Sequence, residues 1–151
     1  MSESLTLRKS KLTDEKLILN WTNDQETRKW SLSSKMISTL EHHQWFERKV
    51  NSPNVLMLIL ERRKKPAGLA RLEINAGGIV LHYLIAPDER GKGLASRLLI
   101  MAMSEKRKIW GNNQVLAYTL PNNIASIKSL EKTGFSLVSA TKELKCYGAN
   151  W

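Results

Sequence analysis

Two glycines and an alanine stand beside two basic residues in the stretch PDERGKGLAS, residues 87–96. An apolar run ends just before this stretch, and from Gly93 onward apolar residues recur at helical spacing. The glycines therefore lie in a predicted strand-to-helix turn, where the first helix amides have no internal partners and the helix dipole is positive. Because a backbone without side chains can wrap a phosphate there, the stretch predicts a site for a phosphate-like anion.

Periodicity along the chain predicts the elements that position this turn. Apolar runs, alternating or continuous, predict strands at residues 4–8, 54–61, 66–75, 78–86 and 114–120. Helical spacing and capping residues predict helices at residues 13–21, 38–50, 93–109 and 122–134. Short turn-like segments join the three middle strands, so we expect these strands to form an antiparallel meander.

The last two predicted helices each have an apolar face that the core would cover. On the helix after the glycines this face consists of Leu94, Leu98, Leu99, Ala102 and Ile109. On the final helix it consists of Ile124, Ile127 and Leu130, and Gly134 is the predicted C-cap. Near the N-terminus, Thr13 is the predicted cap of the first helix, and Ser38 with Glu41 forms the capping-box pattern of the second.

Composition narrows the class of protein and of partner. A chain of 151 residues with 42% hydrophobic residues can bury one real core, so we expect a single domain over residues 1–151. The 24 Lys plus Arg against 14 Asp plus Glu give a net charge of +10, which favours an anionic partner such as nucleic acid, an acidic membrane surface or a phosphate-bearing small molecule. Cys146 is the only cysteine, so no internal disulfide or thiolate zinc site is expected.

Several ligand classes and compartments are disfavoured by the local sequence. The N-terminus lacks the apolar core of a signal peptide and the longest apolar run, residues 55–60, is too short to span a bilayer. We therefore expect a soluble cytoplasmic protein without a membrane partner. His42 and His43 diverge on a helix, which argues against joint metal ligation. The basic segments 61–65 and 106–108 are interpreted as solvated surface rather than RNA contacts.

Two motifs resemble those of a known family. Residues 90–95, Arg-Gly-Lys-Gly-Leu-Ala, match the Arg/Gln-x-x-Gly-x-Gly/Ala signature of the GNAT superfamily of acyl-CoA-dependent N-acetyltransferases. Residues 123–135 resemble that family's second signature, an Asn-led helix that closes on Gly134-Phe135. The resemblance covers nearly the whole chain and implies the GNAT fold, an α+β (α/β/α) architecture. In this fold helices flank a central mixed, mostly antiparallel sheet, whose parallel strands splay at the cofactor cleft.

The resemblance implies acetyl-CoA as co-substrate and no metal. Backbone amides would hold the CoA pyrophosphate and two basic side chains would add charge, in the segment Arg90, Gly91, Lys92, Gly93, Leu94, Ala95 and Ser96. The pantetheine arm would pair with the backbone of Leu84, Ile85 and Ala86 as an added strand. Asn123 and Ser126 would hydrogen-bond the cofactor, with the alternatives that Asn123 only caps its helix and that Ser126 only faces solvent.

Acetyl transfer needs a neutral amine, a stabilised oxyanion and a proton for the departing thiolate. Many GNAT enzymes supply that proton from a tyrosine at the position that holds Leu130 here. The remaining catalytic candidates are His82, Tyr83 and Tyr118. His82 is the candidate base, because an unperturbed histidine pKa suits amine deprotonation, and the alternative is a structural histidine. Strand alternation places His82 and Tyr83 on opposite faces, so at most one is expected to face the cleft.

The acceptor is expected to bind the N-terminal helices, where the candidate residues are Trp21, Asn23, Trp30, His42 and Trp45. Residues 20–46 resemble acetyltransferases that modify the 4-amino group of a nucleotide-linked sugar on the way to pseudaminic acid, although Thr22 replaces the usual Arg. The favoured partner is therefore a small amine, a nucleotide-linked sugar. The alternatives are a ribosomal-type protein or peptide acetyltransferase and a non-catalytic acyl-CoA- or nucleic-acid-binding module. The tryptophans could also be core, and a homodimer is left open.

Overall fold

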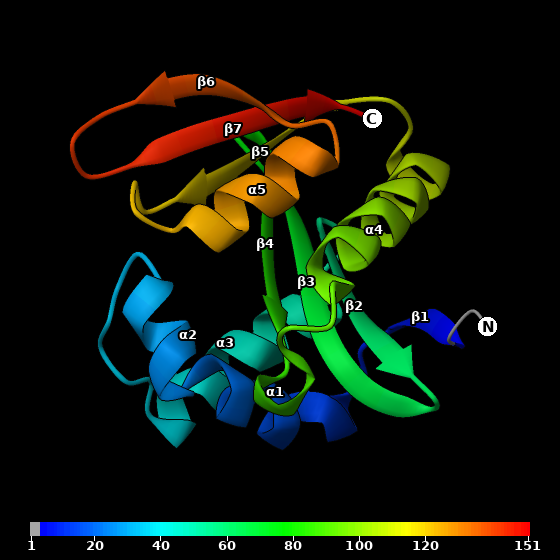
Figure 1. Cartoon of the computed structure of the whole chain (residues 1–151). Coiled ribbons are helices and arrows are strands. Elements are labelled where there is room, and N and C mark those ends of the chain that lie inside the picture. The colour runs from blue at the N-terminus through cyan, green and yellow to red at the C-terminus, as the bar shows by residue number, and fades with distance from the viewer. Residues whose placement is uncertain (1–3) are drawn as a thin grey trace.

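The chain forms one seven-stranded sheet with helices against both of its faces (Figure 1). The structure, a computed structural model, describes residues 4–151. The strands are β1 (Leu5–Lys9), β2 (Val55–Arg62), β3 (Lys65–Asn75), β4 (Gly78–Ile85), β5 (Gln114–Thr119), β6 (Ser136–Ala140) and β7 (Lys145–Asn150). Their order across the sheet is β1-β2-β3-β4-β5-β7-β6, and every neighbouring pair is antiparallel except the parallel pair β4 and β5. The predicted GNAT fold class is confirmed.

Five α-helices and two short 3-10 turns complete the described chain. They are η1 (Leu12–Asp14), α1 (Glu15–Thr22), α2 (Gln25–Trp30), α3 (Thr39–Val50), η2 (Pro87–Glu89), α4 (Leu94–Trp110) and α5 (Ile124–Lys132). Ser38 caps α3 as predicted, since its hydroxyl accepts a hydrogen bond of 3.1 Å from the Glu41 amide. The predicted cap of α1, Thr13, lies instead inside η1, and Asp14 takes the N-cap position.

The periodicity of the sequence missed three elements, α2, β6 and β7, of which β6 is exposed along its whole length. Helix α2 has only six residues and depends on Asp24, whose carboxylate accepts from the amides of Glu26 and Thr27. It is too short and too polar for a periodic pattern. Strand β7 contains Gly148, which weakens a strand pattern. A β-carbon at Gly148 would lie 2.9 Å from a methyl carbon of Val138, so any larger residue there would have to displace that side chain of β6.

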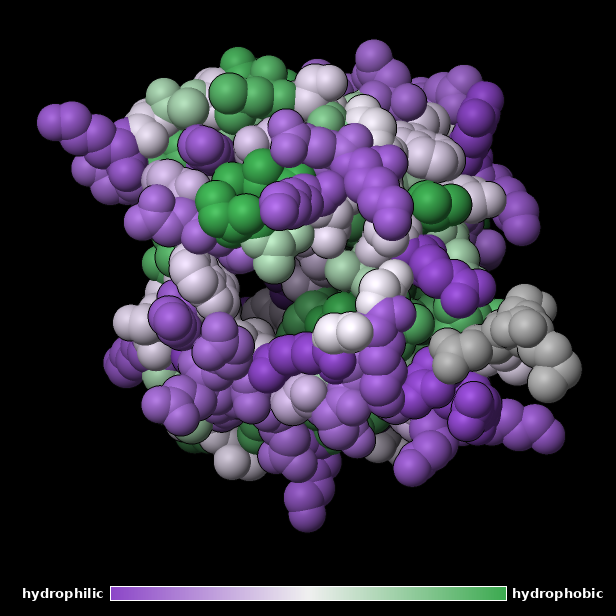
Figure 2. Space-filling model, in the orientation of Figure 1, coloured by the Kyte–Doolittle hydropathy of each residue, from purple (hydrophilic) through white to green (hydrophobic). Residues whose placement is uncertain are grey.

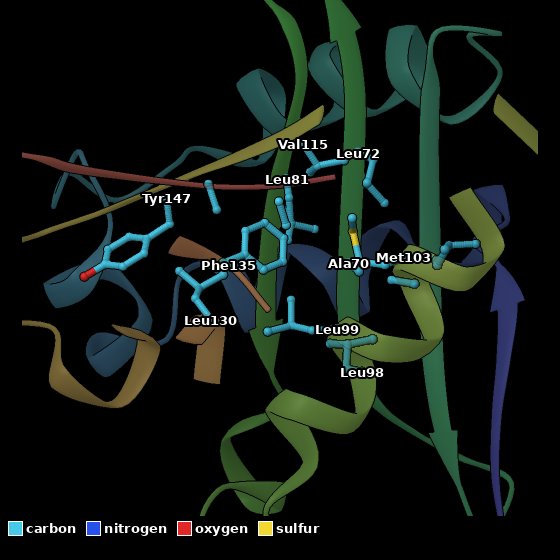
Figure 3. Close-up of a cluster of buried hydrophobic side chains, with 14 of the residues drawn as sticks. Ala70, Leu72, Leu81, Leu98, Leu99, Met103, Val115, Leu130, Phe135 and Tyr147 are labelled. Atoms are coloured by element: carbon cyan, nitrogen blue, oxygen red, sulfur yellow. The ribbon is translucent and has the colours of Figure 1, made fainter. Parts of the chain in front are cut away.

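Apolar side chains pack on both faces of the sheet. On one face, α4 and α5 bury a large cluster in which Leu98, Leu99, Leu130 and Phe135 are at most 2% exposed (Figure 3). On the other face, α1 and α3 cover a smaller cluster, which consists of Ile18, Trp21, Phe46, Met57, Ile59, Leu69 and Ala86.

Two residues of the predicted helix faces lie outside the core. Ile109 is 44% exposed, because the buried position in the last turn of α4 belongs to Lys106. The ammonium group of Lys106 donates to the backbone carbonyls of Gly111, Asn113 and Trp151, which lets a lysine occupy that place. Ile124 is 56% exposed, since it is the first residue of α5 and precedes the packed face of that helix.

The sheet opens between its two parallel strands. In this parallel pair, only Ile79–Leu81 of β4 are paired with β5, and their partners are Val115–Ala117. Beyond these residues β4 continues beside β3 and β5 continues beside β7, so the two strands diverge. The splay expected at the cofactor cleft is therefore present, and it leaves the second half of β4 with one unpaired backbone edge.

Candidate active site

The glycine-rich turn between β4 and α4 has an open backbone. Gly91 has a φ of 76° and Gly93 a φ of 72°, and a β-carbon at either position would meet no atom within 4 Å. Gly93 occupies the N-cap of α4 and makes no side-chain capping bond. Left-handed backbone without side chains thus exposes the first amides of α4, which is the geometry that anion binding requires.

The two basic side chains of the turn are paired with carboxylates. Arg90 Nη2 donates to Asp24 Oδ2 at 2.6 Å and to Thr27 Oγ1 at 2.9 Å. Lys92 Nζ donates to Glu89 Oε2 at 2.9 Å. For Arg90 and Lys92 to add charge to a pyrophosphate contact, each side chain would have to exchange its carboxylate partner for phosphate.

A cavity of about 720 Å³ lies between the N-terminal helices and the splay. Residues of α1, α2, α3 and the segment 31–37 line one side, and residues of β3, β4, β5 and α5 line the other. Figure 2 shows a hollow between the part of the molecule that carries α5 and the part that carries α2. The cavity joins the predicted acceptor region to the opening between β4 and β5.

The charged residues that line the cavity are mostly positive. They are three arginines, Arg28, Arg48 and Arg71, and one glutamate, Glu41. Sequence reasoning missed all of them, although the alternation of β3 could have placed Arg71 on the same face as its cross-strand partner His82. The lining therefore favours a ligand group of negative charge.

Arg28 anchors the segment that follows α2 through hydrogen bonds, and no described carboxylate neutralises its charge. Its guanidinium donates to three backbone carbonyls and one hydroxyl, those of Thr22, Ser33, Lys35 and Ser31. Among residues 4–151 it has no acidic partner. Burial lowers the pKa of Arg28, but an arginine remains charged at neutral pH.

Arg71 lies over the ring of Trp45, with its guanidinium carbon 4.8 Å from the ring centroid. Its Nε is 3.0 Å from Glu73 Oε2, but the N–H makes no hydrogen bond, so the contact is ionic. Glu73 also accepts from Lys49 Nζ at 2.5 Å. Burial lowers the pKa of Arg71 and Glu73 opposes that effect.

His82 and Tyr83 point to opposite faces of β4, as predicted, yet both line the cavity. The expectation that at most one would face the cleft is wrong, because the strand edge beyond Leu81 is open and the cavity reaches both faces. Desolvation by surrounding protein atoms and, after it, the charge of Arg71 lower the pKa of His82 to about 4, although the residue as a whole is exposed. This direction runs against the expectation of an unperturbed histidine pKa.

Tyr83 and Ser126 meet across the cleft between β4 and α5. Their side-chain oxygens are 2.5 Å apart, so the alternative that Ser126 only faces solvent is wrong. Burial raises the pKa of Tyr83. Asn123 caps α5, since its Oδ1 accepts from the Ser126 amide at 3.2 Å. Tyr118 also lines the cavity from β5, and its ring is 39% exposed.

Three of the five predicted acceptor residues, Trp30, His42 and Trp45, line the cavity. Trp21 does not, because it is 6% exposed and packs in the core beneath α1. Asn23 does not either, because its amide is bonded to the backbone of Ile37 at 2.7 and 2.8 Å.

His42 contributes only its ring surface to the cavity. It is 2% exposed, and burial lowers its pKa. Its ring stacks on Phe46 at 5.8 Å. Neither ring nitrogen has a hydrogen-bond partner among the described residues.

Within residues 4–151, no helix is both long enough and apolar enough to cross a bilayer. The same residues contain no cluster of three or more His, Cys, Asp or Glu side chains that could hold a metal ion.

Comparison with known protein families identifies one family for this chain. The family model described as acetyltransferase (GNAT) domain matches residues 4–136. No curated protein sequence matches the chain. Many solved structures do, among them spermidine N-acetyltransferase from Vibrio cholerae in complex with CoA and spermine, at 21% identity and a TM-score of 0.87, covering 97% of this chain and 95% of that one.

Two further structures show the same fold. A domain from Methanocaldococcus jannaschii is 20% identical, with a TM-score of 0.85 and coverage of 99% of this chain and 100% of that one. AAC(6')-Ib in complex with ribostamycin and coenzyme A is 19% identical, with a TM-score of 0.80 and coverage of 96% and 92%.

Proposed function

Because the chain belongs to the acetyltransferase (GNAT) domain family and is an acetyl-CoA-dependent N-acetyltransferase, we propose that its acceptor is a small primary amine that carries a negative group. The acceptor that fits best is the 4-amino group of a nucleotide-linked amino-deoxy sugar. The charge of the cavity lining, with three arginines and one glutamate, is the observation that supports this acceptor class most directly.

The same lining argues against polycationic acceptors. Spermine and ribostamycin, which the related structures contain, carry several ammonium groups at neutral pH. A polycation in this cavity would face Arg28, Arg48 and Arg71, and like charges brought together cost several kcal/mol, by an order-of-magnitude estimate. A pyrophosphate linked to the amino sugar would instead pair with them.

The cofactor region fits acetyl-CoA. The open backbone of residues 91–96 would hold the pyrophosphate, and Arg90 and Lys92 can add to this contact when they exchange their carboxylates for phosphate. The unpaired edge of Leu84–Ala86 would bind the pantetheine arm. Asn123 uses its oxygen as a helix cap, which leaves its amide NH2 for the cofactor.

The positive lining also helps to supply a neutral amine. A bound ammonium group near Arg71 is destabilised by the like charge, so its pKa falls and the neutral, nucleophilic amine is favoured. His82 is neutral at pH 7, because its pKa is about 4, and it can accept a hydrogen bond from the attacking amine. With so low a pKa it is a weak base, and positioning carries more of the rate than proton abstraction.

Peptide and protein acceptors are a weaker fit. An enzyme for basic peptide amines needs an open acidic groove, whereas this cavity is bounded by α1, α2 and α3 and is lined mainly by basic charge. A long peptide would also have to pass the segment 31–37, which Arg28 anchors.

An acceptor screen with acetyl-CoA tests the proposal. The panel contains a UDP-linked and a CMP-linked 4-amino-6-deoxy sugar, the matching free sugar, spermidine, kanamycin and a peptide with a free N-terminus, and CoA release is measured. We expect the highest kcat/KM for a nucleotide-linked sugar, with an advantage that shrinks as salt increases. Equal rates on free and linked sugar, or faster turnover of spermidine, would exclude the acceptor class and leave the acetyl-CoA site untouched.

A further inference from the structure

Tyr83 and Ser126 form a hydroxyl pair in the opening of the sheet. Tyr83 comes from β4, two residues beyond Leu81, the last residue of β4 that is paired with β5. Ser126 comes from the first turn of α5, and the two oxygens are 2.5 Å apart. Both residues line the same cavity that receives the acceptor.

Acetyl transfer from a thioester leaves a thiolate that must be protonated. The resemblance expects a tyrosine for this step at the position of Leu130, but that side chain is apolar, 0% exposed and packed in the core. A protein general acid for this step would therefore have to be another residue at the splay, where the pantetheine arm would enter.

We propose that Tyr83 is the general acid that protonates the departing CoA thiolate, and that Ser126 positions its hydroxyl. The assignment rests on the proposed function of the site. A phenol buried in the cleft stays protonated at neutral pH, as a proton donor must. When the Ser126 hydroxyl donates to Tyr83 Oη, the phenolic proton is free to point toward the cavity, and the same bond stabilises the phenolate as it forms.

The step balances without any further reactant. The amine nitrogen forms a bond to the acetyl carbon, the carbon–sulfur bond breaks, and the electron pair of that bond leaves on sulfur. Tyr83 gives its proton to the sulfur, and the proton lost by the amine nitrogen returns to the phenolate. The products are the acetamide and the CoA thiol.

The other tyrosine on the cavity is less suited to the role. Tyr118 lies on β5 and is 39% exposed, so water competes for its hydroxyl. Its nearest titratable neighbour is Cys146, its cross-strand partner in the β5–β7 pair, which raises the pKa of Tyr118. Tyr147→Phe is the matched control, because it removes the same atom from a tyrosine of β7 that packs in the core and does not line the cavity.

The first experiment compares Tyr83→Phe with Tyr147→Phe in steady-state kinetics on the best acceptor of the screen. We expect Tyr83→Phe to lower kcat by about a hundredfold, the usual size of a general-acid effect, and Tyr147→Phe to stay within about threefold of wild type. The affinity for acetyl-CoA, measured by calorimetry without acceptor, should be unchanged in both variants.

Ser126 is tested as a positioning residue. Ser126→Ala should lower kcat by about tenfold, and Ser126→Thr, which keeps a hydroxyl, should restore most of it. A fluorinated tyrosine at position 83 is a more acidic phenol, so the alkaline limb of the kcat profile should move to lower pH. A residue that only packs in the cleft would not move that limb.

The outcomes separate this inference from the proposed function. If wild-type protein acetylates an amine and Tyr83→Phe keeps its kcat, the general-acid role is excluded while the enzyme assignment stands. If Tyr83→Phe loses acetyl-CoA affinity in proportion to kcat, Tyr83 is a cofactor-binding residue and the inference fails. If wild-type protein binds acetyl-CoA but acetylates no amine of the panel, the proposed function itself fails.

Discussion

Arg90, on the glycine-rich turn, donates a hydrogen bond of 2.6 Å to Asp24, the N-cap of α2. The guanidinium group holds the pKa of the Asp24 carboxyl below its ordinary value. The bond connects the proposed pyrophosphate site to the helix that borders the acceptor cavity. Binding of acetyl-CoA and the position of α2 are therefore expected to depend on each other.

Asp24→Asn tests this connection. Asparagine still caps a helix, but it removes the charge that competes with phosphate for Arg90. We expect acetyl-CoA to bind about two- to fivefold more tightly, the range of a surface ion pair, with the gain falling as salt increases. Calorimetry at two salt concentrations measures this. Glu143→Gln, the same charge change in the β6–β7 turn, should have no such effect, and equal affinity of Asp24→Asn and wild type would contradict the connection.

Gly93→Ala and Gly111→Ala form a matched pair. Both glycines have a positive φ, 72° and 78°, and open space around the added β-carbon. Gly93→Ala should therefore lose about 1–2 kcal/mol of folding stability from backbone strain, measured by thermal or denaturant unfolding. Gly111→Ala should lose at least as much, because its ψ of −166° lies in a region that essentially only glycine adopts. Only Gly93→Ala should also weaken acetyl-CoA binding, by about tenfold or more, because it disturbs amides that meet phosphate. Similar acetyl-CoA affinities of the two variants would show that the turn holds no phosphate.

The charge of the cavity lining should be visible in acceptor kinetics. Arg48→Gln removes an exposed positive charge and should raise the KM of a nucleotide-linked acceptor by about two- to fivefold. Glu41→Gln keeps a side chain that suits the helix cap and should lower that KM. For spermidine the two effects should reverse. The KM of acetyl-CoA should not change, and Lys142→Gln, at the β6–β7 turn, serves as the control.

The low pKa of His82 predicts a pH dependence of stability. In the unfolded chain a histidine titrates near 6.5, whereas in the folded protein the pKa is about 4. Between these values the unfolded state binds more protons, so folding stability falls as pH decreases from about 6.5 to 4. His82→Gln should reduce the difference in Tm between pH 7.5 and 4.5. An unchanged difference would show that the ring is as well solvated in the folded state as in the unfolded one.

Local patterns in the sequence were sufficient to predict most of the fold and the position of the cofactor turn. In the strands from Val55 to Ile85, apolar residues either alternate with polar ones or follow one another without interruption. The turns between these strands are so short that the strands can form only an antiparallel meander. The glycines at 91 and 93 indicate a turn that needs a left-handed backbone, because only glycine adopts it without strain. Elements with weak periodicity, α2, β6 and β7, were missed, because α2 depends on a single side-chain cap, β6 is exposed along its length and β7 contains a packed glycine.

The composition of the catalytic and acceptor sites was decided by the tertiary structure. Three tryptophans in the N-terminal helices look alike in the sequence, but Trp21 is core while Trp30 and Trp45 border the cavity. The pKa of His82, the approach of Tyr83 to Ser126 and the positive lining all arise between residues far apart in the chain. Burial and charge–charge interaction depend on these distances in space, which periodicity along the sequence does not contain.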